Sequence, residues 1–156
     1  MDRRPPVTPE ARLLDTFHEG LAAGELRVRR CTSCGTAQFP PRAVCPACAT
    51  PGAAEWITTG GRGRVWSFGV FHKAYLPDPA PQPPYNVAVV QLDEGPKVIT
   101  NIVAVPLQEI RVGMAVEAVF ATHEPAVRFR PVDPDHEAEH GADHDADHTA
   151  TNQTGR

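Results

Sequence analysis

The stretch that decides the fold is Cys31-Thr32-Ser33-Cys34, followed ten residues later by Cys45-Pro46-Ala47-Cys48. Each C-x-x-C pair presents two thiolates from one tight turn, and two such turns that face each other form a tetrahedral sulfur cage. Gly35 allows a sharp turn after the first pair, and the ten residues 35–44 are enough for a short hairpin that brings the pairs together. The spacing predicts a structural zinc ion held by Cys31, Cys34, Cys45 and Cys48.

Three other uses of the cysteines rank below zinc. Two disulfides suit a secreted chain, whereas residues 1–6 have no apolar stretch behind them and so predict no secretory signal. A redox pair needs one C-x-x-C opening a helix rather than two. Iron in an electron carrier takes the same four thiolates and stays open as an alternative. A closed four-sulfur site has no position for water or substrate, which favours a structural role.

Length and composition place the cysteines within a small protein rich in turns. The 156 residues predict one domain or two very small ones, and 17 prolines with 12 glycines disfavour a helical bundle. We expect a helical segment over 1–24, a four-cysteine ribbon over 25–53, a barrel over 54–132 and a tail over 133–156.

The segment before the ribbon has the signals of one short helix. Thr8-Pro9-Glu10 reads as an N-cap, a proline in the first helical position and an acid in the first turn. An apolar stripe follows at helical spacing, formed by Leu13, Phe17 and Leu21 and widened by Leu14. Gly24 is the expected end of this helix.

Short runs with strand character follow the ribbon. They cover residues 65–72, 86–92, 97–103, 116–120 and 126–130, and turns separate them. Five strands in so short a stretch predict a small closed or partly open barrel. The interval 76–84 contains five prolines and predicts an extended loop, either a passive connector or part of a binding side.

The charge is unevenly distributed. Residues 133–156 hold seven acids and one base, with His136, His140, His144 and His148 at every fourth position. Without apolar residues such a tail is expected to be disordered, with weak metal binding as the other interpretation. Residues 1–132 hold 14 bases and 12 acids, a poor balance for a nucleic-acid surface. No apolar run is long enough to predict a membrane span.

Gly60-Gly61-Arg62-Gly63-Arg64 precedes the first barrel strand. Glycines let backbone amides approach an anion and arginines add charge, although the same glycines would also suit a simple bend from ribbon to barrel.

The sequence contains no recognisable set of catalytic residues, because there is no Gly-x-Ser-x-Gly and Asp93-Glu94 is typical of a turn. His18, His72 and His123 read as surface or satisfied histidines. The lack of a catalytic set of residues argues against an enzyme that acts alone.

The order of helix, ribbon and barrel resembles one family of zinc-ribbon/OB-fold proteins that occur with thiolase-like enzymes and carry a domain of unknown function. The resemblance covers about residues 9–132 and rests on stretches that include 17–21, 30–35, 38–42, 45–48, 61–68, 89–95, 100–103 and 112–114. His18 departs from it, since the family commonly has an aromatic such as tryptophan there, and the acidic tail is absent from the family pattern.

The resemblance implies a mainly β fold with an N-terminal helix, a rubredoxin-like zinc ribbon and a five-stranded OB-fold barrel. It implies a non-catalytic accessory subunit in lipid metabolism, and the lack of a predicted secretory signal or membrane span leads us to expect it in the cytoplasm. Its partner would be a thiolase-like or lipid-transfer-type enzyme that processes acyl-CoA, such as a thiolase, an acyltransferase or a steroid side-chain aldolase. In that light Gly61, Arg62, Gly63 and Arg64 become candidate contacts for the phosphates of coenzyme A (CoA).

A nucleic-acid-binding module is the alternative function, because ribbons and OB barrels both bind single strands. That mode needs a basic groove with stacking aromatics. Few aromatics stand in the barrel outside Trp66, Phe68 and Phe71, so the sequence favours the accessory subunit.

Overall fold

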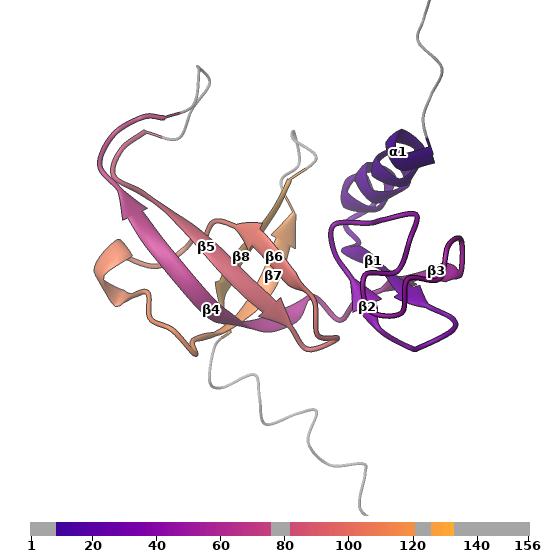
Figure 1. The fold of residues 1–156 in the computed structure, drawn as a ribbon. Helices are drawn as coiled ribbons and strands as arrows, with labels where there is room; N and C mark the ends of the chain where they lie inside the picture. Colours follow the sequence, from indigo (N-terminus) through magenta and orange to yellow (C-terminus); the bar gives the residue numbers. More distant parts are fainter. Residues whose placement is uncertain (1–8, 76–81, 121–125, 133–156) are drawn as a thin grey trace, which may run out of the picture.

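One helix and two β-sheets follow each other along the chain in the computed structural model (Figure 1), which describes residues 9–75, 82–120 and 126–132. The helix α1 (Pro9–Ala22) precedes a three-stranded sheet. That sheet contains β1 (Arg27–Cys31), β2 (Ala37–Gln38) and β3 (Ala54–Thr58). The second sheet contains β4 (Arg62–Phe71), β5 (Tyr85–Leu92), β6 (Lys97–Thr100), β7 (Ala115–Phe120) and β8 (Val127–Pro131), with a 3-10 turn at Leu107–Glu109.

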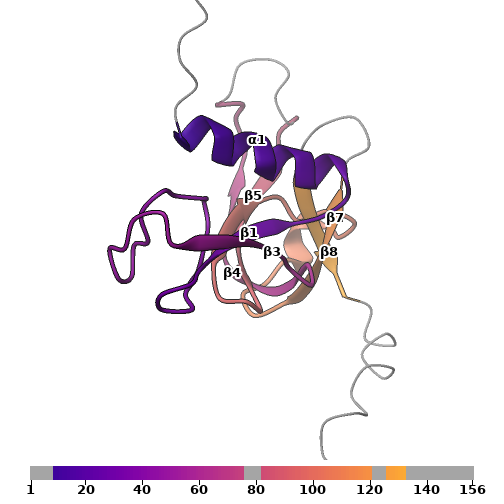
Figure 2. The ribbon, with the colours of Figure 1, turned by 90° about the vertical axis from the view of Figure 1, so that its right-hand side faces the viewer.

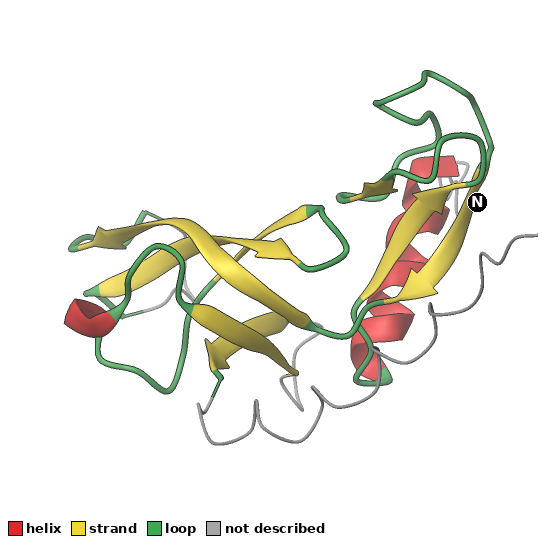
Figure 3. Ribbon diagram, turned by 90° about the horizontal axis from the view of Figure 1, so that it is seen from below, coloured by secondary structure: helices red, strands yellow, loops and turns green. Residues whose placement is uncertain are grey.

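Helix α1 packs its apolar stripe against the ribbon. Figures 2 and 3 show the helix lying along β1 and β3. Phe17 and Leu21 are buried, and the Phe17 ring lies 5.2 Å from that of Phe39. Leu14, expected to widen the stripe, is 46% exposed, and on this helix burial begins only at Phe17. The helix ends where Gly24 takes a positive φ and the Glu25 amide donates to the Gly20 carbonyl, a left-handed helix end.

The first sheet has the order β2-β1-β3, with both pairs antiparallel. Strand β3 pairs along the whole of β1, from Arg27 opposite Thr58 to Cys31 opposite Ala54. Residues 54–58 therefore lie in the ribbon sheet, whereas the sequence pattern groups them with the barrel. The expected domain boundaries stay a prediction, but this pairing shows that the ribbon needs the chain on both sides of its cysteine loops.

The second sheet has the antiparallel order β6-β5-β4-β7-β8 and curls until its two edges meet. They meet at a single bridge between Ile102 and Phe129 rather than along a full ladder. Phe129 is fully buried there, its amide donates to the Asn101 carbonyl and its carbonyl accepts from the Val103 amide. The prediction of a mainly β fold with one N-terminal helix is confirmed, in the form of a partly open barrel.

A buried asparagine fixes the chain where it leaves β6. Asn86 of β5 donates from Nδ2 to the Ile102 carbonyl at 2.8 Å, and its Oδ1 accepts from the Ile102 amide at 2.7 Å. Asn101 returns a bond to the Asn86 carbonyl. Because a buried amide without partners costs stability, this side chain holds residues 101–102 against β5 in the position that the bridge to β8 requires.

Four expectations fall on parts of the chain outside the described residues. They concern Thr8 as the N-cap, most of the proline-rich loop, at residues 76–81, His123, and the acidic tail, at residues 133–156. Among the helices that the structure describes, none has the length and apolar character to cross a bilayer.

Gly63 is the position where the barrel tolerates no side chain. A Cβ at Gly63 would overlap the Gln91 carbonyl oxygen, whereas a Cβ at Gly69 of the same strand would first meet the Phe71 ring at 3.5 Å. We expect Gly63→Ala to lower the free energy of unfolding by about 1–3 kcal/mol through overpacking. Gly69→Ala is the matched control and should change it by less than about 1 kcal/mol. Urea unfolding measures both, and equal effects would contradict the packing described here.

Candidate metal centre

The two C-x-x-C turns have the same backbone geometry. In the first, the Gly35 amide donates to the Cys31 carbonyl at 2.8 Å. In the second, the Ala49 amide donates to the Cys45 carbonyl at 2.9 Å. The residue after each pair is left-handed, with φ of 75° at Gly35 and 58° at Ala49. The shared geometry aims all four thiols into one space.

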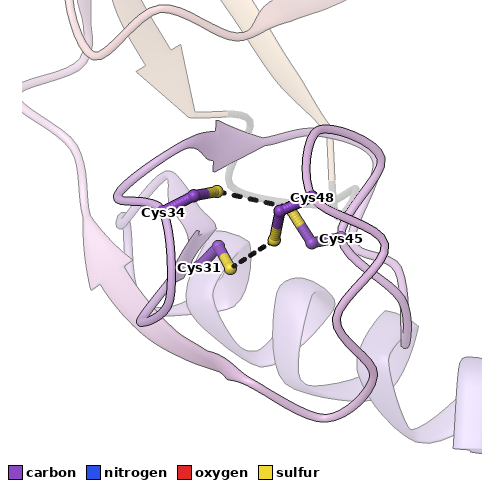
Figure 4. Close-up of side chains that lie close together, drawn as sticks. All are labelled: Cys31, Cys34, Cys45 and Cys48. Atoms are coloured by element: carbon purple, nitrogen blue, oxygen red, sulfur yellow. Dashed lines mark hydrogen bonds between the residues drawn. The ribbon is translucent and has the colours of Figure 1, made fainter.

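The four sulfurs come together as the spacing predicts (Figure 4). All lie within 4.8 Å of one another, and the Cys31–Cys48 and Cys34–Cys45 sulfur pairs are each 3.7 Å apart. A tetrahedral zinc ion with Zn–S bonds of about 2.3 Å requires sulfurs about 3.8 Å apart. The donors fit the metal, and Cys31, Cys34, Cys45 and Cys48 would hold it in a closed site.

A threonine stands beside the second cysteine of each turn. The Thr50 hydroxyl lies 3.3 Å from Cys48 Sγ, and with the Thr50 amide it stabilises the thiolate, which lowers the pKa of Cys48 to about 6. The Thr36 hydroxyl, 3.3 Å from Cys34 Sγ, lowers the pKa of that thiol in the same way. Both thiols are therefore biased toward the thiolate that a metal requires. Sequence reasoning missed these threonines, although the repeat C-x-x-C-x-T could have revealed them.

A buried arginine, also missed, connects the loops that carry the cysteines. Arg29 is only 7% exposed and donates from Nη1 to the Arg42 carbonyl at 2.7 Å and from Nη2 to the Ala54 carbonyl at 2.5 Å. Among the described residues no carboxylate pairs with it. A buried cation without a counter-charge is costly. Four thiolates and one divalent ion carry a net charge of −2, so the metal centre supplies negative charge close by in sequence, two residues along β1 at Cys31.

The candidate CoA-contact residues lie at the start of β4. Two amides of this glycine-rich segment are already bonded within the chain, that of Gly60 to Glu94 Oε1 at 2.7 Å and that of Gly61 to Thr59 Oγ1 at 3.2 Å. Arg62 is half-buried, while Arg64 is exposed and donates to the Gly113 carbonyl at 3.2 Å. The segment therefore offers an anion its arginine side chains rather than these two amides.

The described residues form no catalytic arrangement. Neither His18 nor His72 hydrogen-bonds a carboxylate, hydroxyl or thiol within the part of the chain that the structure describes. An open hollow of about 590 Å³ is lined mainly by Val105, Glu109, Arg111, Val112, Met114 and Val132, and Gly61, Arg62, Gly63 and Arg64 do not contribute to it.

Helix, four-sulfur ribbon and curled five-stranded sheet define a protein of the zinc-ribbon/OB-fold class. Two family models match it, the rubredoxin-like zinc ribbon domain of ChsH2 over residues 18–52 and the C-terminal OB-fold domain of ChsH2 over residues 56–121. The chain belongs to this ChsH2/DUF35 family of zinc-ribbon/OB-fold proteins. The zinc prediction is confirmed, because the ribbon model covers all four clustered cysteines.

Three relatives illustrate the family. A DUF35 domain-containing scaffold protein of Methanocaldococcus jannaschii is 40% identical over 58% of this chain and 64% of its own length. A probable enoyl-CoA hydratase alpha subunit of Thermomonospora curvata is 36% identical over 78% of this chain. This chain spans 38% of that subunit. The solved structure of an Ltp2-ChsH2(DUF35) aldolase matches with a TM-score of 0.67 and 30% identity, over 82% of this chain and 98% of that one.

Loss of one ligand should unfold the ribbon and spare the barrel. We expect Cys34→Ser and Cys45→Ser each to lower the zinc content of the purified chain, since three thiolates hold the ion less tightly than four. The barrel has its own buried residues, so most strand signal in circular dichroism should remain. Elemental analysis reports zinc. Unchanged zinc content in both variants, or loss of the barrel's strand signal together with the zinc, would contradict a structural role confined to the ribbon.

Removal of the Arg29 cation should weaken the metal centre without touching a ligand. In Arg29→Gln the Arg42 and Ala54 carbonyls lose their charged donor, and the metal centre loses a nearby positive charge. We expect zinc transfer to a chromogenic chelator to become about tenfold faster, as a loss of roughly 1.4 kcal/mol implies. Arg30→Gln, at an exposed position of the same strand, is the matched control. Identical release from all three proteins would contradict this role.

Proposed function

We propose that this chain is a non-catalytic accessory subunit of an enzyme that processes acyl-CoA. The observation that carries the proposal is the match to the chain in the Ltp2-ChsH2(DUF35) aldolase structure, because 98% of that chain is covered by helix, ribbon and OB-fold together. The name of that aldolase joins two components, Ltp2 and ChsH2. An accessory role fits the present chain, since its thiols are clustered for a metal and its described histidines have no catalytic partner.

The names of the relatives also indicate which kind of enzyme the partner could be. The relatives' names describe a scaffold protein, a hydratase subunit and an aldolase, and acyl-CoA chemistry is explicit in the hydratase. We propose a thiolase-like or lipid-transfer-type partner that holds the catalytic residues while this chain docks on it and helps to bind the CoA portion. Unpaired thiolates that must stay reduced favour a cytoplasmic location.

Gly61, Arg62, Gly63 and Arg64 are the proposed contacts for CoA phosphate. Support comes from Arg64, which is exposed, and from Arg62, which is half-buried on the same face of β4. Gly63 lets β4 approach the β5 backbone closely enough to hold both arginines in place. Guanidinium groups bind phosphate oxygens through two parallel hydrogen bonds.

Purification of the tagged full chain from its native host tests the accessory role. We expect an enzyme of acyl-CoA metabolism to be recovered in fixed stoichiometry, and we expect its activity to fall when this chain is removed and to return when it is added back. Tagged Cys34→Ser, which should lack an intact ribbon, is the control for specific association. Recovery of the chain alone, or an enzyme whose activity is indifferent to it, would contradict the proposal.

Charge reversal tests the phosphate contacts. Arg62→Glu with Arg64→Glu replaces attraction for phosphate by repulsion, so the affinity of the complex for CoA should fall by at least about tenfold. Isothermal titration of the complex with CoA measures this. Arg30→Glu, an exposed position of the ribbon, is the matched control. Unchanged binding in the double variant would remove these residues from the site.

A further inference from the structure

A row of polar side chains crosses three strands of the barrel on its outer face. Lys97 of β6 is the register partner of Gln91 of β5, and Gln91 is the partner of Arg64 of β4. All three are exposed, while the residues beside them along each strand, Val98, Leu92 and Val65, are buried. With strands about 5 Å apart, the backbones of Lys97 and Arg64 are roughly 10 Å apart.

An exposed tryptophan lies in the same region. Trp66 follows Arg64 by two positions, which places it on the same face of the strand, and it is 53% exposed. The register of β4 on β5 shifts between Val65 and Ser67, so Trp66 sits at a β-bulge. Lys97 Nζ lies 3.8 Å from the indole centroid, a cation–π contact that holds the charge and the aromatic ring together.

The neighbouring row is different because its charges are compensated. Arg62 is the register partner of Glu117, and Glu117 Oε1 already accepts from Arg130 Nε at 2.8 Å and from Arg130 Nη2 at 2.7 Å. Asp93 lies at the other side, its amide bonded to the Arg62 carbonyl. The partners of Arg64, by contrast, are uncharged, namely Gln91 and Ala115. An anion is therefore attracted more strongly to Arg64 than to Arg62.

We propose that Arg64, Trp66, Gln91 and Lys97, here called the Trp66 face, bind the adenine nucleotide portion of an acyl-CoA. This rests on the proposed function and moves the centre of the CoA contact from the glycine-rich segment to the open sheet. Arg64 and Lys97 contact the 3′-phosphate and the 5′-diphosphate, and the indole packs against the purine. Ile99, 74% exposed at the next outward position of β6, extends the face with apolar surface.

The charge pattern favours one nucleotide over a nucleic-acid strand. A strand requires a basic groove that follows its backbone over several nucleotides, with several aromatic side chains along it. The described part of this face has one exposed tryptophan and two cations, Arg64 and Lys97, and the adjoining row is neutral. Such a set matches the clustered phosphates and single base of CoA.

Titration of the zinc-loaded full chain with CoA tests the proposal. Binding should quench tryptophan emission in the natural chain and in Trp56→Phe, which retains Trp66. Arg64→Gln and Lys97→Gln should each weaken binding by about tenfold, since each removes a charge-assisted contact. Arg62→Gln should weaken it by less than about threefold, and Arg30→Gln is the matched control that should not change it. Zinc content and circular dichroism verify that each variant is folded.

Three results would overturn the Trp66 face. They are CoA binding that leaves Trp66 emission unchanged, equal weakening by Arg62→Gln and Arg64→Gln, and tighter binding of a thymidine oligonucleotide than of CoA. Each can occur while the acyl-CoA enzyme still co-purifies, in which case the accessory role stands and this site does not. CoA binding that depends on Arg64 and Lys97, in a chain that recovers no enzyme, would instead support the face and contradict the accessory role.

Discussion

The fold depends first on the four-thiolate centre. Between Cys31 and Ala54 the chain contributes only partly buried apolar side chains, such as Ala37 and Phe39, to the core. Strand β2 has two residues, and the remaining loops have little else to order them. Segments too small for their own core commonly rely on a metal. The metal centre fixes the loops, the loops bring β3 to β1, and helix α1 packs on Phe39 and the ordered sheet.

The connection from ribbon to barrel is made by backbone and by shared core. The Thr59 amide donates to the Leu26 carbonyl immediately after β3, and Leu26 and Val28 of the ribbon belong to the same buried cluster as Val65 and Phe129 of the barrel. Burial of such side chains contributes about 1.5–3 kcal/mol each, enough to couple the two sheets. Loss of the metal should therefore also weaken the packing where the ribbon meets the barrel, even though the barrel retains its own strands.

The sequence predicts local features well and pairing between distant segments poorly. C-x-x-C spacing and strand periodicity are encoded within a few residues, and the metal site and the five barrel strands followed from them. The membership of β3 in the ribbon sheet could not be foreseen, because it depends on Arg27–Cys31 meeting Ala54–Thr58 across two cysteine loops. The same holds for Arg29, whose partners are carbonyls 13 and 25 residues away, and for Lys97 over Trp66.

The glycine-rich segment shows how an ambiguous pattern is decided by packing. Gly63 is required because the β5 backbone occupies the space where its side chain would stand, and Gly61 takes a positive φ of 69°. The glycines thus shape the start of the strand. The groups that can attract an anion are the side chains of Arg62 and Arg64. With Arg62 and Arg130, the carboxylates of Glu117 and Asp93 make one row neutral, whereas the register partners of Arg64 carry no charge. Positive charge and exposed apolar surface coincide on the outer face of β4, β5 and β6, where Arg64, Trp66, Lys97 and Ile99 are all exposed.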